Sequence, residues 1–455
     1  MKHNSFIAVV VMAFLFSAAP SMAPGESGKA FAQPVVSLKG EVRHKPEMRD
    51  NSDFDSGKDD KTAYVGNRIR LSANVKADDD VSALITLQDA RYWAQNANNV
   101  ESGREKEAVD IYEAWAQMKN IGGNNLGIKI GRQILAYGDQ RLLGHLGWQD
   151  NARSSDAFKV MAGIGSINLD LFLSKQKESM HTSDASHDDD LNGLYATTNV
   201  AEGITLDVYA LQWKTAGSKT TTTTDASGKE TTSTVAIKDK NIMTMGARVA
   251  AKLGALDATA EYVVQSGDWA DGVTQSANAL AVTAGYKLDI LGGTRIGVEY
   301  DMGSGDDDPK DKKHKTFVFP FHTNHAHYGY MDYFSWGNMK DMVVKINANV
   351  TPALNVAIDY HMFSLAAAQD DWLNVVGTGV FKKAVSSSTA TDAGKEIDLT
   401  ITYKAWALKV DDKPVATWGI QAGYSVFQPG QAAKDRSGGK SDSSNWGFIS
   451  STLTF

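Results

Sequence analysis

The sequence contains no cysteine, and beyond its first thirty or so residues it contains no long apolar run. The first absence excludes a disulfide framework, a thiolate metal site and the cysteine that anchors a lipoprotein. The second excludes helical membrane spans from most of the chain, because a helix needs about 18 to 20 apolar residues to cross a bilayer. A barrel strand is not excluded in this way, since only every second residue faces lipid and about ten residues are sufficient.

An excess of positive charge is also missing. The chain has 46 Lys and Arg against 54 Asp and Glu, which gives a net charge of -8 over 455 residues. This mildly acidic balance argues against nucleic acid as a partner.

The N-terminus has the pattern of a secretory signal peptide. Lys2 precedes an apolar run from Phe6 to Ala19, and Ala30 to Ala32 form a small-residue cleavage site. We therefore expect a cleaved signal peptide at residues 1–32 and a single mature domain at residues 33–455. The alternative is an uncleaved anchor, for which the apolar run is short.

From Val35 to Phe455 the chain divides into about eighteen segments in which polar and apolar residues alternate. This period of two is typical of β-strands. The connections alternate between short tight ones and long polar ones, as in outer-membrane barrels. The fold class that we predict is all-β: a transmembrane antiparallel β-barrel of about 18 strands in the bacterial outer membrane.

Several connections carry specific expectations. An even strand number places both termini at the periplasmic side, where the short turns lie, and the final Phe455 looks like the signal read by the barrel-assembly machinery. The connection between Ala405 and Val415 is expected to be an unusually long periplasmic one. The long outer connections include Ala136 to Arg153, Thr215 to Asp239, Gly267 to Ser276, and Gly303 to Gly337. The second of these contains a low-complexity tract that is expected to be a mobile loop.

Alternation also separates the two faces of each strand. Ile397 and Leu399 are expected to face lipid, and Glu396 and Asp398 the bore, because a charge facing lipid at the midplane costs about 2 to 4 kcal/mol. The same reasoning places further charged residues in the bore, namely Lys39, Glu41, Arg43, Arg68, Arg70, Glu113, Lys119, Arg248, Glu261, Arg295, Glu299, Asp301, Lys345 and Asp359. Such charges either neutralise one another or form a track for an ionic solute, and a barrel of this size holds an aqueous path unless loops plug it.

The arginines are concentrated in the first third of the mature chain, from Arg43 to Arg153. Guanidinium binds carboxylates bidentately and stays charged, so an anionic solute is expected.

Several motifs resemble the alginate-export family of outer-membrane proteins. They include Gly131-Arg132-Gln133, Tyr137 to Arg141 followed by Trp148, Asn151-Ala152-Arg153, Asp156-Ala157-Phe158, Glu261-Tyr262, the segment from Phe319 to Asp341, and Lys395 to Asp398. The resemblance implies an eighteen-stranded monomeric barrel with an arginine-containing constriction through which an acidic, alginate-like polysaccharide leaves the cell. It also implies that Arg132, Arg141, Arg153 and Asp156 line the conduit. Because the three arginines fall within one hairpin and its loop, we expect them to lie near one another around the narrowest part of the bore and to select for anions.

Other functions remain open: a general or substrate-specific uptake porin for a small anion, and a surface adhesin or scaffold. An enzyme is not expected, since no serine lies in a Gly-x-Ser-x-Gly context and Glu299 with Asp301 are explained as bore lining. The expected partners are the lipid bilayer and lipopolysaccharide, and no cofactor is expected. His322, His325 and His327 are weak candidates for metal ligands, because their spacing matches no zinc pattern and a loop folded into the bore explains them better.

Overall fold

The computed structural model describes residues 33–93, 109–178, 188–224, 230–323 and 325–455, and the side chains of 217–238 are not described. The chain divides into two units, Met1–Pro34 and Val35–Phe455. The predicted signal peptide at residues 1–32 lies outside the described residues. None of the helices in the described ranges has the length and hydrophobicity needed to cross a membrane.

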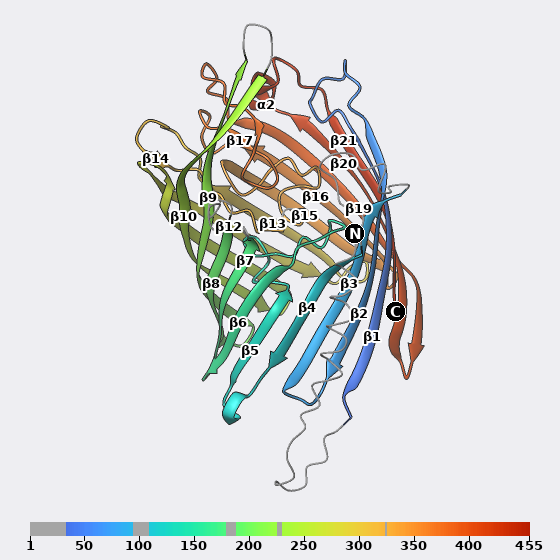
Figure 1. Cartoon of the computed structure of the whole chain (residues 1–455). Coiled ribbons are helices and arrows are strands. Elements are labelled where there is room, and N and C mark those ends of the chain that lie inside the picture. The colour runs from blue at the N-terminus through green and yellow to red at the C-terminus, as the bar shows by residue number, and fades with distance from the viewer. Residues whose placement is uncertain (1–32, 94–108, 179–187, 225–229, 324) are drawn as a thin grey trace. The chain divides into compact units, whose positions relative to one another are not determined.

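Val35–Phe455 forms a closed antiparallel barrel of eighteen long strands (Figure 1), which confirms the predicted fold class. Each long strand pairs with the next, and β1 pairs with β21 to close the ring. The long strands are β1 Val35–Asp50, β2 Thr62–Lys76, β3 Val81–Tyr92, β4 Asp110–Met118, β5 Leu126–Gln133, β6 Ser155–Ile164, β7 Ile167–Lys177, β8 Asp189–Ala201, β9 Ile204–Thr224, β10 Glu230–Leu253, β11 Leu256–Ala270, β12 Val273–Leu288, β13 Thr294–Gly303, β15 Met339–Thr351, β16 Leu354–Ser364, β19 Asp392–Val410, β20 Lys413–Pro429 and β21 Ser444–Thr454. The short elements are η1 Ile121–Gly123, β14 Lys313–His314, β17 Trp372–Leu373, β18 Val380–Lys382 and α2 Gln431–Arg436.

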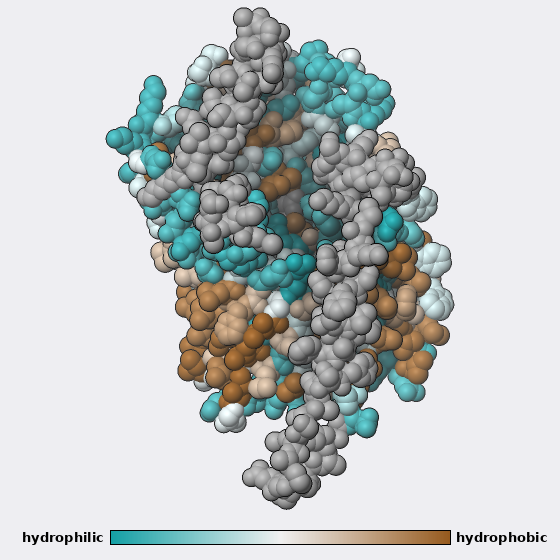
Figure 2. Space-filling view, in the orientation of Figure 1, coloured by the Kyte–Doolittle hydropathy of each residue, from teal (hydrophilic) through white to brown (hydrophobic). Residues whose placement is uncertain are grey.

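The two faces of the wall separate as alternation predicts. Ile397 and Leu399 of β19 are 51% and 37% exposed on the outside, whereas Glu396 and Asp398 are 0% and 2% exposed on the inside. Hydrophobic residues form a belt over the outer wall next to the short-turn end, and hydrophilic residues cover the wall toward the long-loop end (Figure 2). This belt is the surface that a bilayer would cover.

Three connections are shorter than expected from the sequence. The predicted loops at 215–239 and 267–276 are wrong, because β9 and β10 continue to the pair Thr224↔Glu230, and β11 and β12 continue to the pair Ala270↔Val273. The threonine tract is β-branched and favours strand conformation. The periplasmic connection expected to be long is also a tight turn, in which Asp411 and Asp412 both take the positive φ of a two-residue hairpin.

The hydrophobic core lies inside the bore at the long-loop end. Two connections fold into the barrel: the first inward loop (residues 134–154) and the second inward loop (residues 304–338), which contains β14. Phe334 of the second inward loop stacks on Phe363 of β16 and on Trp372 of β17, with ring centroids 4.0 and 4.5 Å apart. Phe427 of β20 is completely buried in the same cluster. Packed aromatic side chains of the wall and the inward loops therefore occupy the bore at this end.

Candidate functional site: the charged lumen wall and its inward loops

Two arginines hold the first inward loop against the wall. Arg43 of β1 donates to the carbonyls of Gly147 and Trp148 at 3.1 and 2.9 Å, and it pairs with Asp150. Arg68 of β2 donates to the carbonyls of Gly147 and Gln149 at 2.9 and 3.0 Å. Trp148 also packs on Phe448 of the last strand, with centroids 4.6 Å apart. Both arginines were predicted to face the lumen. Each one binds a carboxylate and also holds the backbone of the first inward loop in place.

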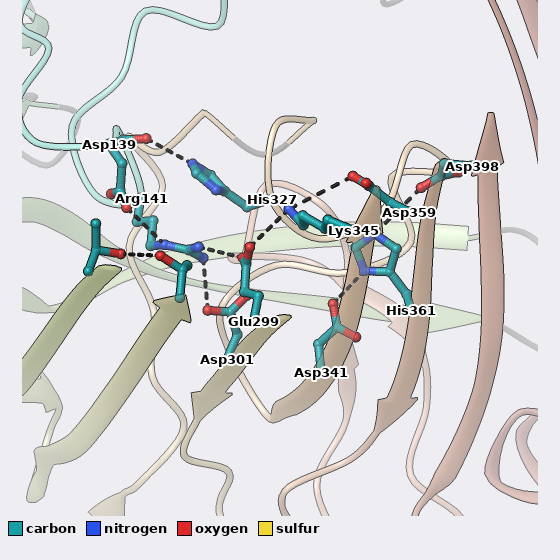
Figure 3. A network of polar contacts seen from close by, with 12 residues as sticks. Asp139, Arg141, Glu299, Asp301, His327, Asp341, Lys345, Asp359, His361 and Asp398 are labelled. Carbon is teal, nitrogen blue, oxygen red and sulfur yellow. Dashed lines mark hydrogen bonds and ion pairs between the residues drawn. The ribbon is translucent and has the colours of Figure 1, made fainter. Parts of the chain in front are cut away.

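Arg141 is the buried anchor of the same loop. Its guanidinium pairs with Glu299 and Asp301 of β13, and the three side chains are 1%, 5% and 0% exposed (Figure 3). Burial by itself would lower the pKa of Arg141, but the nearby charges of Asp301 and Glu299 outweigh it and raise this pKa well above the usual value. The arginine is therefore permanently charged and occupied by wall carboxylates.

The ion-pair network continues around the wall (Figure 3). Lys345 of β15 contacts Glu299 at 2.9 Å and Asp359 of β16 at 3.9 Å. His361 of β16 lies between Asp341 at 2.6 Å and Asp398 at 3.5 Å. This side of the barrel thus carries a seam of carboxylates, most of them buried beneath the inward loops.

The second inward loop docks on the same seam through its backbone. The amide of Met331 donates to Glu396 at 2.8 Å, and the amide of Tyr330 donates to Asp398 at 3.3 Å. Gly329 has φ of +78°, and a Cβ there would lie 2.6 Å from the Glu396 carboxylate. Glycine is therefore required for this close approach.

Arg153 connects the two inward loops. It donates to the carbonyls of Gly144, His322 and Pro320 at 3.4, 3.2 and 2.9 Å. Burial lowers its pKa to about 10, so it remains charged at neutral pH. Within the described ranges it makes no ion pair with a carboxylate.

Two other lumen residues from the sequence prediction have local partners. Glu261 of β11 accepts a hydrogen bond from Tyr209 of β9, and it is 6% exposed. Arg295 of β13 makes a bidentate pair with Asp257 near the short-turn end. Neither contacts the inward loops through these bonds.

Arg132 and Asp156 lie on the outer face of the wall, which corrects the expectation that they line the bore. They pair bidentately at 2.9 and 2.8 Å across β5 and β6, with 38% and 57% of their side chains exposed. Arg132 shares its face with Ile130, which is 54% exposed, whereas the neighbouring Gln133 is fully buried. The three arginines singled out from the sequence do not share one site, because Arg141, Arg153 and Arg132 bind three separate sets of partners.

The three candidate histidines have separate partners as well. His322 contacts the carbonyls of Phe319 and Val375. His325 stacks on Trp148 at 4.2 Å and contacts Asp332, and His327 donates to the carbonyl of Asp139 at 2.9 Å. Within the described part of the chain, no group of three or more His, Asp or Glu side chains has the arrangement of a metal site.

A set of three cations on aromatic rings, the cation–aromatic ladder, follows the wall from β1 to β5. Lys45 lies 3.9 Å from the ring centroid of Trp148, Arg70 lies 3.7 Å from that of Tyr112, and Lys129 lies 3.8 Å from that of Trp115. Lys45 is toward the long-loop end of β1, and Arg70 and Lys129 are midway along β2 and β5.

Arg70 and Lys129 make no ion pair within the described ranges, and one guanidinium nitrogen of Arg70 is buried without a hydrogen-bond partner. Sequence reasoning identified Arg70 but missed Lys45, Lys129 and the two aromatic residues of β4. The alternation of Glu113, Trp115 and Gln117 beside inward-facing cations is the signal that could have found Trp115 and Lys129. Tyr112 lies at a bulge of β4, which alternation does not predict.

A closed eighteen-stranded barrel with an apolar outer belt and a charged, loop-lined interior defines the class of outer-membrane channels. The chain belongs to the alginate export family, whose model matches residues 35–446. This confirms the resemblance found in the sequence motifs. The protein is therefore an outer-membrane β-barrel embedded in the bilayer of a bacterial outer membrane.

Solved structures of similar fold include Acinetobacter baumannii OccAB2, with a TM-score of 0.59, 11% identity and coverage of 92% of this chain and 98% of that chain. Pseudomonas aeruginosa OccK2 (OpdF) in complex with glucuronate has a TM-score of 0.58 and 10% identity, with coverage of 92% of this chain and 98% of that chain. Pseudomonas aeruginosa OccK11 (OpdR) has a TM-score of 0.56 and 10% identity, with coverage of 93% of this chain and 95% of that chain. At these identities the likeness concerns the fold alone. No curated protein matches the sequence.

Proposed function

We propose that this channel passes an acidic, alginate-like polysaccharide outward, along the wall formed by β1 to β5. The observation that carries the proposal is the cation–aromatic ladder. The partly exposed rings of Trp115 and Trp148 offer apolar faces to sugar rings, whereas Tyr112 is buried beneath Arg70. Arg70 and Lys129 make no ion pair with a carboxylate in the described ranges, so a carboxylate of the solute can approach them.

The carboxylate seam on β13 to β19 supports the same preference for anions. Its carboxylates are largely buried under the inward loops and engaged by Arg141, Lys345, His361 and backbone amides. Fixed charges that face the aqueous space select ions, whereas buried and paired charges contribute little to that field. The unpaired cations of the ladder, Arg70 and Lys129, would then give the channel its preference for anionic solutes.

Selectivity in a planar bilayer tests this function. Under a tenfold KCl gradient, the wild-type channel should show a reversal potential of anion preference, and Arg70→Gln with Lys129→Gln should shift it toward cations. The matched control is Arg132→Gln, which removes an arginine from the outer face and should leave the potential unchanged. A cation-selective wild-type channel, or a double variant with unchanged selectivity, would overturn the proposal.

A second function, uptake of a small anion, is favoured by the filling of the bore by the inward loops. One structural neighbour was solved with glucuronate, which like an alginate unit is a carboxylated sugar. Chain length separates the two functions. A polysaccharide conduit should be blocked for longer by longer uronate oligomers added from the periplasmic side, whereas a small-solute porin should respond to the monomer and exclude long chains.

A further inference from the structure

A polar cavity of about 300 Å³ lies at the extracellular end of the ladder, between the wall and both inward loops. Three strands contribute to it through Arg49 of β1, Tyr64 of β2 and Tyr92 of β3. The first inward loop adds Gln149 and Asn151, whose side chains are exposed. The cavity is thus bordered by elements that are far apart in sequence and are held together by the contacts of Arg43 and Arg68.

We infer that this cavity is a saccharide-binding subsite that holds one carboxylated sugar residue at the outer mouth of the channel. The inference rests on the proposed function, because it names the unit that the channel holds and where. It goes beyond the ladder, since Arg49, Tyr64, Tyr92, Gln149 and Asn151 take no part in the three cation–aromatic pairs.

The charges that line the cavity leave one cation for a ligand. Each lining carboxylate already has a partner from the protein: Glu47 pairs with Lys45 at 2.8 Å, Asp150 pairs with Arg43, and Asp332 contacts the His325 ring at 3.2 Å. Arg49 instead donates to the carbonyl of Met331 at 2.7 Å and lies over the ring of Tyr333 at 5.6 Å. In the part of the chain that is described, it has no carboxylate partner within ion-pair distance. A carboxylate on the ligand would therefore find a guanidinium that no protein carboxylate occupies and that can bind it bidentately.

The uncharged lining groups fit the rest of a sugar. The rings of Tyr64 and Tyr92 meet at 4.5 Å and 66°, and both are partly exposed, so an aromatic surface borders the cavity. The amides of Gln149 and Asn151 can donate to and accept from hydroxyl groups. A cation, two tyrosines and two amides around one small cavity form the set that recognises a uronate ring, with specificity supplied by few polar groups.

Equilibrium binding to the full-length mature barrel in detergent tests the subsite without requiring transport. A trimer of mannuronate is titrated by calorimetry, with the neutral maltotriose as the comparison. We expect the uronate trimer to bind at least about tenfold more tightly than maltotriose. Arg49→Gln should abolish this preference, and Tyr92→Ala should weaken both sugars, with Tyr92→Phe restoring binding to within about threefold.

Arg91→Gln is the matched control, because Arg91 pairs with Asp89 on the outer face beside the cavity and its loss should change nothing. Heat-modifiable migration on gels verifies that each variant is folded. Equal binding of the two trimers, or unchanged binding in Arg49→Gln, would overturn the subsite. If binding depends on Arg49 but the channel shows no anion preference, the proposed function fails while the subsite stands; the reverse result leaves the function and removes the subsite.

Discussion

Replacing Arg141 by Met should release the first inward loop from the wall. The substitution leaves Glu299 and Asp301 buried at 5% and 0% exposure, with their shared guanidinium gone. Breaking a buried ion pair by removing one partner costs about 3 to 5 kcal/mol. Since about 1.4 kcal/mol is a factor of ten in an equilibrium, the ratio of docked to released loop should fall by about two to four powers of ten.

Limited proteolysis and single-channel recording measure this release. We expect Arg141→Met to make residues 134–154 cleavable in the folded barrel and to increase the open-channel conductance, because the loop occupies the bore. The matched control is the triple variant Arg141→Met with Glu299→Gln and Asp301→Asn. Removing all three charges together avoids the uncompensated buried carboxylates, so the triple variant should recover much of the loop protection. If Arg141→Met is as resistant to protease as the wild type, or if the triple variant is no better than the single one, the anchoring role of Arg141 is refuted.

Three further predictions concern pH, barrel closure and the long hairpin. Burial, reinforced by Arg141, lowers the pKa of His327 to about 3, so the docked loops hold this histidine in its neutral form. The stability of docking should therefore be greatest above the ordinary pKa of 6.5 and should fall between pH 6.5 and pH 3, by at most about 1.4 kcal/mol per pH unit. Loop cleavage should rise with acidification, and His327→Gln should reduce that pH dependence if the histidine causes it. The ring of Phe455 lies where a Cβ of Gly40 would be, 2.3 Å away, so Gly40→Leu should lower the temperature at which the barrel unfolds on heat-modifiability gels, whereas Gly419→Ala, with no neighbour closer than 4.0 Å, should not. In the β9–β10 hairpin, residues 217–224 and 230–237 pair only with each other. Replacing residues 217–237 by an Asn-Gly turn should therefore leave the unfolding temperature within about 2 °C of the wild type, and a larger drop would show that the hairpin supports the barrel.

The barrel could be predicted from the sequence because each strand repeats the same simple pattern. Segments such as β16 and β19 show apolar and charged residues in strict alternation, and one side must face lipid. Turns were harder to predict, since composition does not distinguish a polar loop from a hairpin that continues beyond the membrane. The threonine tract in β9 and β10 is polar and of low complexity, yet its β-branched side chains favour an extended backbone.

The inward loops were beyond what periodicity can show. Their aromatic residues, among them Phe317, Tyr328 and Trp336, are too many for a solvated loop, and this density was the available signal. The partners of Arg141 and Arg153 depend on contacts between residues far apart in sequence, which no local pattern encodes. Arg132 was placed in the conduit by family resemblance, although its alternation with Ile128 and Ile130 already indicated the outer face.

The attachment of the first inward loop to β1 has a consequence for the order of assembly. Trp148 of this loop packs on Phe448 of β21 while its neighbours Gly147 and Asp150 are bound by Arg43 of β1, so one short loop contacts both strands of the closing pair from inside. The first and last strands therefore meet over a surface that the connection between β5 and β6 supplies. We accordingly expect ring closure and loop docking to favour each other during assembly, because each brings together groups that the other needs.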